Sequence, residues 1–478
     1  MAQANPAADP NAIDPRVFPP SARRGAECRE LKLNGIRATA LTAEFGSPLY
    51  VVDEQAARTR ARDVRAALEA EAARIGTGAT VYYAGKAFLC VEVAQWMADE
   101  GLAIDVASGG ELAVALAAGV DPARIGFHGN NKSEGEIARA VAAGVGTIII
   151  DSALETERIA RAASAAGRRQ RVRLRVNSGV HASTHDFLAT SHEDQKFGQP
   201  LAEAPRLVAA ILDHDSLEFV GLHCHIGSQI FATDGFRESA RRLLGAYPEL
   251  ERLLGGPVPE LNLGGGFGIA YTSAQADEAP DVAAIARELA DIVAETCAEI
   301  GIAVPQLAFE PGRAVIGQAG VTLYTVGTTK PVPLAGSDAA ADAADLGFPE
   351  RLYVSVDGGM SDNARPALYG ADYQVRIANR VSDADPALVR VVGKHCESGD
   401  IVVQRDVLPG DVRPGDTLAV AVTGAYCWSL SSNYNYVPRP PVVAVSNGAA
   451  RVIVRGETED ELLAKSVIPA PVAPAHAG

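Results

Sequence analysis

A few short stretches of this chain combine residue types that can do chemistry. Lys86 lies in YYAGKAF, directly after an apolar run with the composition of a strand. A lysine held among apolar side chains can lose its charge and form a Schiff base with an aldehyde. Most lysines are solvated surface residues, so its position at a strand end is what makes Lys86 a candidate for covalent catalysis.

Two glycine-containing stretches have the composition of an anion site. LNLGGGFG contains Gly265 and Gly266, and FEPGR places Gly312 between Glu310 and Arg313. Backbone N–H groups can approach an anion closely where a side chain is missing, and arginine pairs with phosphate or carboxylate groups. Glycines also make ordinary tight turns, and Glu–Arg pairs also occur on solvated surfaces. Both interpretations therefore stay open for each stretch taken alone.

The stretch HCHIGSQ contains two histidines around a cysteine, an arrangement that could suggest a metal site. Side chains alternate on a strand, so His223 and His225 share one face and Cys224 takes the other. The three side chains therefore cannot bind one ion together, although a two-histidine site stays open. An imidazole stacked on a flat cofactor, with Ser228 near a phosphate, fits the stretch better.

Three later stretches could recognise a substrate. DGGMSDNARPALYG contains Arg365 and Tyr369, and GAYCWSLSSNYN contains Tyr426 among small polar residues. Arginine suits a carboxylate, and a tyrosine hydroxyl can reach a phosphate; a surface loop and a packed tyrosine are the alternatives.

The third stretch, GKHCESGD, places Cys396 and Glu397 between glycines. Cys396 could be a metal ligand, a core filler, half of a disulfide or a proton donor. The six cysteines form no CxxC pair, so neither a disulfide framework nor a zinc ribbon is favoured.

The elements that must position these residues follow a regular rhythm. Eight apolar, strand-like runs alternate with Ala- and Leu-rich helical stretches: TVYYAGK, LAIDVASGG, RIGFHGNN, TIIIDS, VRLRVNSG, FVGLHCHIGS, ELNLGGGFG and LAFEPGR. Eight strand–helix units over some 250 residues are typical of a (β/α)8 barrel, whose active site lies at the C-terminal ends of the strands. A doubly wound sheet is the alternative. The polar residues that end each run favour the barrel.

The rest of the chain has a different composition. After about residue 325, six strand-like runs separated by turn signals predict a mostly β domain, of sandwich or barrel-like form. The expected parts are a disordered extension 1–25, a segment 26–55 packed with the β domain, the barrel 56–325, the β domain 326–465 with a loop insertion at 333–347, and a flexible tail 466–478.

Charge and composition restrict the partners. The 478 residues carry a formal charge of −16 at pH 7, which argues against nucleic acid or an anionic membrane as the main partner. Local arginines can still bind an anionic substrate. No apolar run approaches the length that spans a membrane, and the N-terminus lacks the apolar core of a signal peptide. We therefore expect a cytoplasmic enzyme that acts on a small molecule.

Taken together, the motifs resemble a known family. YAGKA, HxHIGSQ, LGGGFG, EPGR, DGGMSDNARPALYG, CESGD and GAYCxSxSSNYN, in this order, resemble the fold-type III pyridoxal-phosphate decarboxylases and, among these, most closely the diaminopimelate decarboxylases. The resemblance covers roughly residues 40 to 460. It implies decarboxylation of meso-diaminopimelate to L-lysine and CO2, the last step of lysine biosynthesis, by a carboxy-lyase that uses pyridoxal 5'-phosphate and no metal.

The resemblance also implies roles for the matching residues. Those expected to bind the cofactor are Lys86, His225, Ser228, Gly265, Gly266, Glu310, Gly312, Arg313 and Tyr426. Those expected to bind the substrate are Arg313, Arg365, Tyr369, Glu397 and Tyr426. Lys86 would hold the cofactor covalently, Glu310 would pair with its ring nitrogen, and Cys396 would donate a proton. In this family the active site forms between two subunits, so a homodimer is expected, with the CESGD loop coming from the partner.

Four alternatives stay open. The first is a related decarboxylase acting on ornithine, arginine or carboxynorspermidine, which would want acids where Arg313 and Arg365 stand. The second is an enzyme similar to alanine racemase, whose motif order differs. The third is a non-catalytic pyridoxal-phosphate carrier, which would lack the β domain. The fourth is a metal-dependent barrel enzyme.

Overall fold

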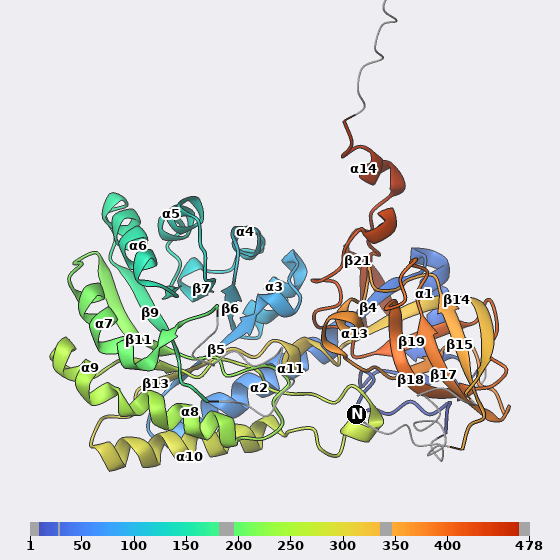
Figure 1. Cartoon of the computed structure of the whole chain (residues 1–478), viewed down its shortest axis with the longest axis horizontal. Coiled ribbons are helices and arrows are strands. Elements are labelled where there is room, and N and C mark those ends of the chain that lie inside the picture. The colour runs from blue at the N-terminus through green and yellow to red at the C-terminus, as the bar shows by residue number, and fades with distance from the viewer. Residues whose placement is uncertain (1–8, 27–28, 181–195, 335–346, 468–478) are drawn as a thin grey trace, which may run out of the picture.

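The computed structural model of the chain describes residues 9–26, 29–180, 196–334 and 347–467. A barrel of strands and helices, drawn in blue to yellow, lies beside a mostly β domain drawn largely in orange and red (Figure 1). The two parts are joined through the first helix of the barrel and the long strand that follows its last turn.

Eight parallel strands close into the barrel. They are β5 (Ala79–Ala84), β6 (Ala103–Val106), β7 (Ile125–Phe127), β8 (Thr147–Ile150), β9 (Gln170–Asn177), β11 (Leu217–His223), β12 (Glu260–Asn262) and β13 (Gln306–Phe309). Each pairs in parallel with the next, and β13 returns to pair with β5. Each strand coincides with one of the eight apolar runs in the sequence, so the predicted (β/α)8 barrel is confirmed.

Helices cover the outside of the barrel. They are α2 (Glu54–Arg74), α3 (Val91–Asp99), α4 (Gly109–Ala117), α5 (Glu134–Ala143), α6 (Ala153–Ala165), α7 (Ala204–Leu212), α8 (Asp234–Gly245), α9 (Tyr247–Leu254) and α10 (Val282–Ile300). Local sequence explains their ends. Ser133 and Glu136 form a capping box at the start of α5, and Gly144 ends that helix in the left-handed conformation. Asp281 caps the start of α10 by accepting a hydrogen bond from the Ala283 N–H, and Gly301 ends that helix in the left-handed conformation. No described helix combines the length and apolar composition needed to cross a membrane.

The second part of the chain is mostly β, as predicted. Its strands are β4 (Leu49–Asp53), β14 (Gly320–Pro333), β15 (Glu350–Val356), β16 (Val375–Ile377), β17 (Pro386–Val392), β18 (Ile401–Pro409), β19 (Thr417–Ala421), β20 (Val442–Ser446) and β21 (Ala449–Val454). They follow the order β18-β17-β15-β14-β4-β20-β21, with β19 pairing with β14 and β16 pairing with β19. The early strand β4 lies inside this sheet, between β14 and β20, so the N-terminal part of the chain completes the β domain.

The N-terminal segment is more ordered than its composition suggested. Residues 1–25 were expected to be disordered, but the side chains of Val17 and Phe18 are fully buried. The Gln318 side chain also donates hydrogen bonds to the carbonyls of Pro15 and Phe18, at 2.8 and 3.1 Å. This apolar pair outweighs the polar, proline-rich composition around it, so residues 9–25 form a strap that packs against the protein.

Three expected features lie outside the described residues: residues 1–8, most of the insertion at 333–347, and nearly all of the tail after residue 466. Within the described residues, four short elements precede β4. They are β1 (Arg23–Arg24), β2 (Leu31–Leu33), β3 (Ile36–Arg37) and α1 (Ala38–Phe45).

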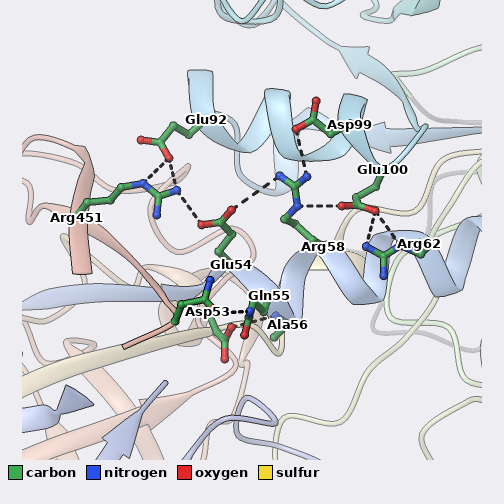
Figure 2. A network of polar contacts seen from close by, with 11 residues as sticks. Asp53, Glu54, Gln55, Ala56, Arg58, Arg62, Glu92, Asp99, Glu100 and Arg451 are labelled. Carbon is green, nitrogen blue, oxygen red and sulfur yellow. Dashed lines mark hydrogen bonds and ion pairs between the residues drawn. The ribbon is translucent and has the colours of Figure 1, made fainter. Parts of the chain in front are cut away.

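Ion pairs connect the barrel helices with the β domain (Figure 2). Arg451 of β21 pairs with Glu54 at the start of α2, at 2.8 Å, and with Glu92 of α3, at 2.6 Å. On the same side of α2, Arg58 pairs with Glu100 at 2.9 Å. Asp53 caps α2 by accepting a hydrogen bond from the Ala56 N–H. These contacts fix the helix that leads into the barrel against the last strand of the β domain.

Candidate active site

A cavity of about 390 Å3 opens at the C-terminal ends of the barrel strands. Eight of the expected site residues line it: Lys86, His225, Ser228, Glu310, Arg313, Arg365, Tyr369 and Tyr426. Gly266 and Gly312 line a smaller space of about 40 Å3 that shares six of those residues. The cavity therefore brings together residues separated by some 340 positions, from the barrel and from the β domain.

Lys86 stands on a short turn (Gly85–Ala87) that follows β5. The Lys86 side chain lines the cavity and is exposed within it. The turn itself is tightly held. A Cβ on Gly85 would lie 2.8 Å from the Asp105 carbonyl oxygen, and the Tyr426 N–H donates to the Ala87 carbonyl at 2.7 Å. Tyr426 has a left-handed φ of 68°, a strained conformation for a bulky residue. The β domain thus fixes the backbone that carries Lys86.

Glu310 forms the floor of the cavity after β13. One of its oxygens accepts a hydrogen bond from the Asn262 side chain at 2.7 Å, and His223 Nε2 lies 3.1 Å from the carboxylate. Burial alone would raise the pKa of Glu310, but the nearby His128 and His223 outweigh it and hold this pKa well below its ordinary value. Glu310 therefore stays ionised and can accept a hydrogen bond from an N–H group of a ligand in the cavity.

His225 presents a neutral ring to the cavity. Burial lowers its pKa well below the ordinary value, and the charges of Lys86 and Arg175 add to this effect. The Gly265 N–H lies 3.2 Å from His225 Nδ1, which acts as the acceptor. This contact fixes the plane of the imidazole. Cys224, the neighbour of His225, packs away from the cavity against Ser178.

The smaller space has the shape of an anion cradle. A Cβ on Gly266 would lie 2.2 Å from the Gly227 carbonyl oxygen, and one on Gly312 would lie 3.0 Å from two alanine side chains. Gly266 also has a φ of 101°, which favours glycine. Arg313 Nη2 donates to Ser228 Oγ at 2.9 Å on the wall of this space. Backbone N–H groups, a hydroxyl and a guanidinium together suit a phosphate group.

Two buried arginines share an aromatic wall. Arg313 begins α11 (Arg313–Ile316) and Arg365 begins α13 (Arg365–Tyr369). The Arg313 guanidinium donates to the Tyr271 hydroxyl and lies 4.6 Å from the Tyr426 ring centre. The Arg365 guanidinium lies 4.7 Å from the Tyr271 ring centre and donates to the Tyr373 hydroxyl at 2.6 Å. The cavity thus offers two oriented cations for carboxylate groups.

Cys396 and Glu397 stand elsewhere. Both are exposed and neither lines the cavity. Their loop is nevertheless anchored, because the Asp400 carboxylate accepts from the backbone N–H groups of Met360 and His395, at 2.6 and 2.7 Å. His395 is buried in turn. Within one chain, the expected proton donor and the expected nucleophilic lysine are therefore not brought together.

Several residues of the cavity were missed from the sequence. Asp105 and His128 end the runs LAIDVASGG and RIGFHGNN, so the rule that polar residues at strand ends face the barrel mouth could have identified both. Tyr271, which contacts Arg313 and Arg365 behind the cavity lining, lies in a connecting segment after β12 and carried no comparable signal. His128, His223 and Glu310 have ligand atoms within 4.8 Å of one another, a spacing found at metal sites. Here both Nε2 atoms face the Glu310 carboxylate, at 3.2 Å for His128 and 3.1 Å for His223.

Sequence comparisons agree with this geometry. The family model described as "Pyridoxal-dependent decarboxylase, pyridoxal binding domain" matches residues 61–317. The diaminopimelate decarboxylase of Mycobacterium tuberculosis is 49% identical over 461 residues, which cover 95% of this chain and 98% of the relative. That of Bacillus subtilis is 41% identical over 435 residues, covering 91% and 94%.

Solved structures are similar over the whole chain. A diaminopimelate decarboxylase from M. jannaschii superposes with a TM-score of 0.82 at 30% identity, covering 94% of this chain and 98% of that one. A diaminopimelate decarboxylase from Helicobacter pylori, complexed with L-lysine, gives a TM-score of 0.76 at 26% identity, covering 89% and 98%. The likeness includes both the barrel and the β domain.

Proposed function

The chain belongs to the pyridoxal-dependent decarboxylases, in the group of the diaminopimelate decarboxylases, and from that premise we propose that it converts meso-2,6-diaminopimelate to L-lysine and CO2. The observation that carries the choice of substrate is the pair of buried guanidiniums, Arg313 and Arg365, in one cavity. Ornithine and arginine end in a cation, which two arginines would repel. A substrate with a second carboxylate matches them.

The cavity fits pyridoxal 5'-phosphate. Bound there, this cofactor supplies a protonated ring that withdraws electrons from the carbon that loses CO2. Lys86 would hold the aldehyde end, and the neutral His225 ring would pack on the flat face. The ionised Glu310 would hold the proton on the ring nitrogen. The cradle at Gly266 and Gly312 would hold the phosphate, since added side chains would fill that space.

The residues of the chain control binding and proton placement. Arg313, Arg365 and Tyr369 would orient the distal carboxylate, which leaves the other end of the substrate at Lys86. Burial of the Arg313 and Arg365 side chains strengthens their charged contacts. After CO2 leaves, a positioned acid must return a proton to the same carbon, and we assign this role to Cys396.

A second copy of the chain would bring Cys396 to the cavity. Cys396 and Glu397 are exposed on an anchored loop and do not reach the cavity of their own chain. A homodimer with two-fold symmetry would place the loop of each subunit at the cavity of the other. Glu397 would then bind the distal amino group of the substrate.

Turnover with defined substrates tests the proposed function. The purified protein, loaded with pyridoxal phosphate, should release CO2 from meso-diaminopimelate and form L-lysine in equal amounts. The Lys86→Ala variant, which keeps the cavity walls, should form neither product. Ornithine and arginine serve as matched substrates that lack the second carboxylate, and they should react at least about tenfold more slowly. Faster turnover of ornithine, or no lysine from diaminopimelate, would contradict the proposal.

A further inference from the structure

The barrel floor below Glu310 contains buried charged groups that the proposed reaction does not use. Asp105 of β6 and His128, which follows β7, are both buried. Neither oxygen of the Asp105 carboxylate, nor His128 Nε2, makes a hydrogen bond of good geometry to any described residue. Buried carboxylates without partners are costly. The position of His128 indicates what offsets that cost.

His128 lies between two carboxylates. Its Nε2 atom is 3.3 Å from Asp105 Oδ1 and 3.2 Å from Glu310 Oε1, the distances of an ion pair shared between both. Its ring lies edge-on to His223, with centroids 5.0 Å apart. Gly126 makes room for this arrangement, because a Cβ there would lie 2.4 Å from Asp105 Oδ1. One imidazole thus joins the carboxylate that faces the cofactor to a second carboxylate deeper in the barrel.

The charges of the group follow from burial and proximity. Burial acts to lower the pKa of His128, but Glu310 and Asp105 outweigh it and raise this pKa to about 9. Burial and the Glu310 charge raise the pKa of Asp105 to about 6, although His128 lowers it. Burial lowers the pKa of His223 to about 4, so that ring is neutral. At neutral pH the group holds one cation between two anions.

We propose that His128 is a positioning residue that acts through Glu310: its imidazolium neutralises Asp105 and keeps Glu310 as the ionised partner of the ring nitrogen. The inference rests on the proposed use of pyridoxal phosphate. Without the cation, two nearby buried carboxylates would compete for one proton, as like charges in a shared site do. A protonated Glu310 could no longer hold a proton on the ring nitrogen.

Other charged groups face the same floor of the barrel, and they stay unchanged in the variants that test the inference. His128 acts electrostatically on Glu111 of α4 and on His223 of β11, while Arg173 and Arg175 of β9 act on Asp105 and His223 respectively. Arg173 binds Glu260, with its Nη2 at 2.7 Å, and its charge also acts to lower the pKa of Asp105.

Paired substitutions in the full-length enzyme with bound cofactor test the inference. His128→Gln removes the charge and keeps a polar side chain of similar reach. Its visible cofactor spectrum should change with pH between about 6 and 8, as the carboxylate pair takes up a proton. Its kcat on diaminopimelate near neutral pH should fall at least about tenfold. In the unsubstituted enzyme, the corresponding change should appear only as pH rises through about 9, where His128 loses its proton.

The double variant Asp105→Asn with His128→Gln separates charge from packing. Removing the second carboxylate together with the cation should restore a spectrum that is constant between about pH 6 and 8, and a kcat within about threefold of the original. If His128 only fills space, the double variant should be at least as impaired as His128→Gln. That result, or a His128→Gln spectrum that does not change with pH, overturns the inference.

One measurement needs no variant. Nitrogen-15 spectra of the histidine-labelled holoenzyme at pH 7.5 should show a buried imidazolium, and a neutral ring at position 128 would contradict the inference. If the unsubstituted enzyme does not decarboxylate diaminopimelate, only the proposed substrate is contradicted. The spectral titration and the nitrogen-15 measurement would still test His128.

Discussion

Tyr271 illustrates how a single side chain can set the geometry of two charges. It is buried, its hydroxyl accepts from Arg313, and its ring lies beneath Arg365. The ring edge also meets Tyr373, which binds Arg365 from the other side. Two guanidiniums that would otherwise repel each other are thereby held apart on one aromatic surface.

Tyr271→Phe should therefore weaken substrate binding more than chemistry. The ring remains, but the hydrogen bond that orients Arg313 is lost, which corresponds to about 1–2 kcal/mol. KM for diaminopimelate should rise about 5- to 30-fold while kcat stays within about threefold. Tyr353→Phe is the matched control, since Tyr353 also accepts from an arginine, Arg390 at 3.3 Å, which does not line the cavity. Equal KM values in the two variants would contradict the role of Tyr271.

Among the elements, the N-terminal strap at residues 9–25 is the part whose contribution to stability is easiest to measure. Phe18→Ala should lower the free energy of unfolding by about 3–5 kcal/mol, because the ring is fully buried and its loss leaves a cavity. Arg451→Ala removes the ion pairs of Figure 2, whose charged groups are partly exposed, and should cost about 1 kcal/mol or less. Urea unfolding at low and high salt would measure both.

The two variants also differ in their salt dependence. The effect of Arg451→Ala should shrink at high salt, since screening already weakens the pairs with Glu54 and Glu92. The effect of Phe18→Ala should not. A Phe18→Ala variant as stable as the unsubstituted protein would mean that the strap is dispensable, as its composition had suggested.

The sequence predicted the elements in which local pattern and tertiary structure agree. The barrel strands were found because each apolar run ends in polar residues at the mouth, and Lys86, His225 and Glu310 were found because they occupy those ends. β14 was missed, because this long strand crosses the boundary that the composition placed near residue 325. β4 and β20 were also missed.

What the sequence could not predict depends on contacts between distant segments. Tyr271 has no motif, and only the folded chain gives it two arginine neighbours, Arg313 of α11 and Arg365 of α13. The strap differs from expectation for the same reason, because its composition is that of a disordered end, while the Phe18 carbonyl accepts a hydrogen bond from Gln318, 300 positions later. Asp105 and His128 were visible at strand ends, but their pairing with Glu310 required the closed barrel.

At the scale of the whole molecule, the position of Cys396 links the proposed active site to the proposed homodimer. The loop that carries it is exposed but held firmly, because His395 lies 2.8 Å from Ser361 Oγ and 3.1 Å from Asn435 Oδ1. Such anchoring suits a loop that must present a side chain at a fixed place on another surface. Exposed Tyr434 and Tyr436 flank the same region and offer apolar area for a contact between subunits.

A heterodimer of two inactive variants gives the sharpest test of a shared site. Subunits carrying Lys86→Ala and subunits carrying Cys396→Ala should each be inactive, or nearly so, as homodimers. Co-expressed with different tags and purified as the mixed species, they should regain about half of the original activity, because one of the two cavities then has both an intact lysine and an intact cysteine. Native mass spectrometry would establish that the species assayed is the heterodimer.

The matched control combines Lys86→Ala with Glu310→Ala. Both side chains line the cavity of their own chain, so each cavity of that heterodimer keeps one defect and no activity should return. If neither heterodimer regains activity, Cys396 acts in the same chain as Lys86 and the shared site is excluded. Full activity of the Cys396→Ala homodimer would remove the thiol as proton donor, while leaving the decarboxylation itself intact. A Cys396→Ser homodimer that regains part of the activity would indicate that a hydroxyl at this position can also deliver the proton from the partner's loop.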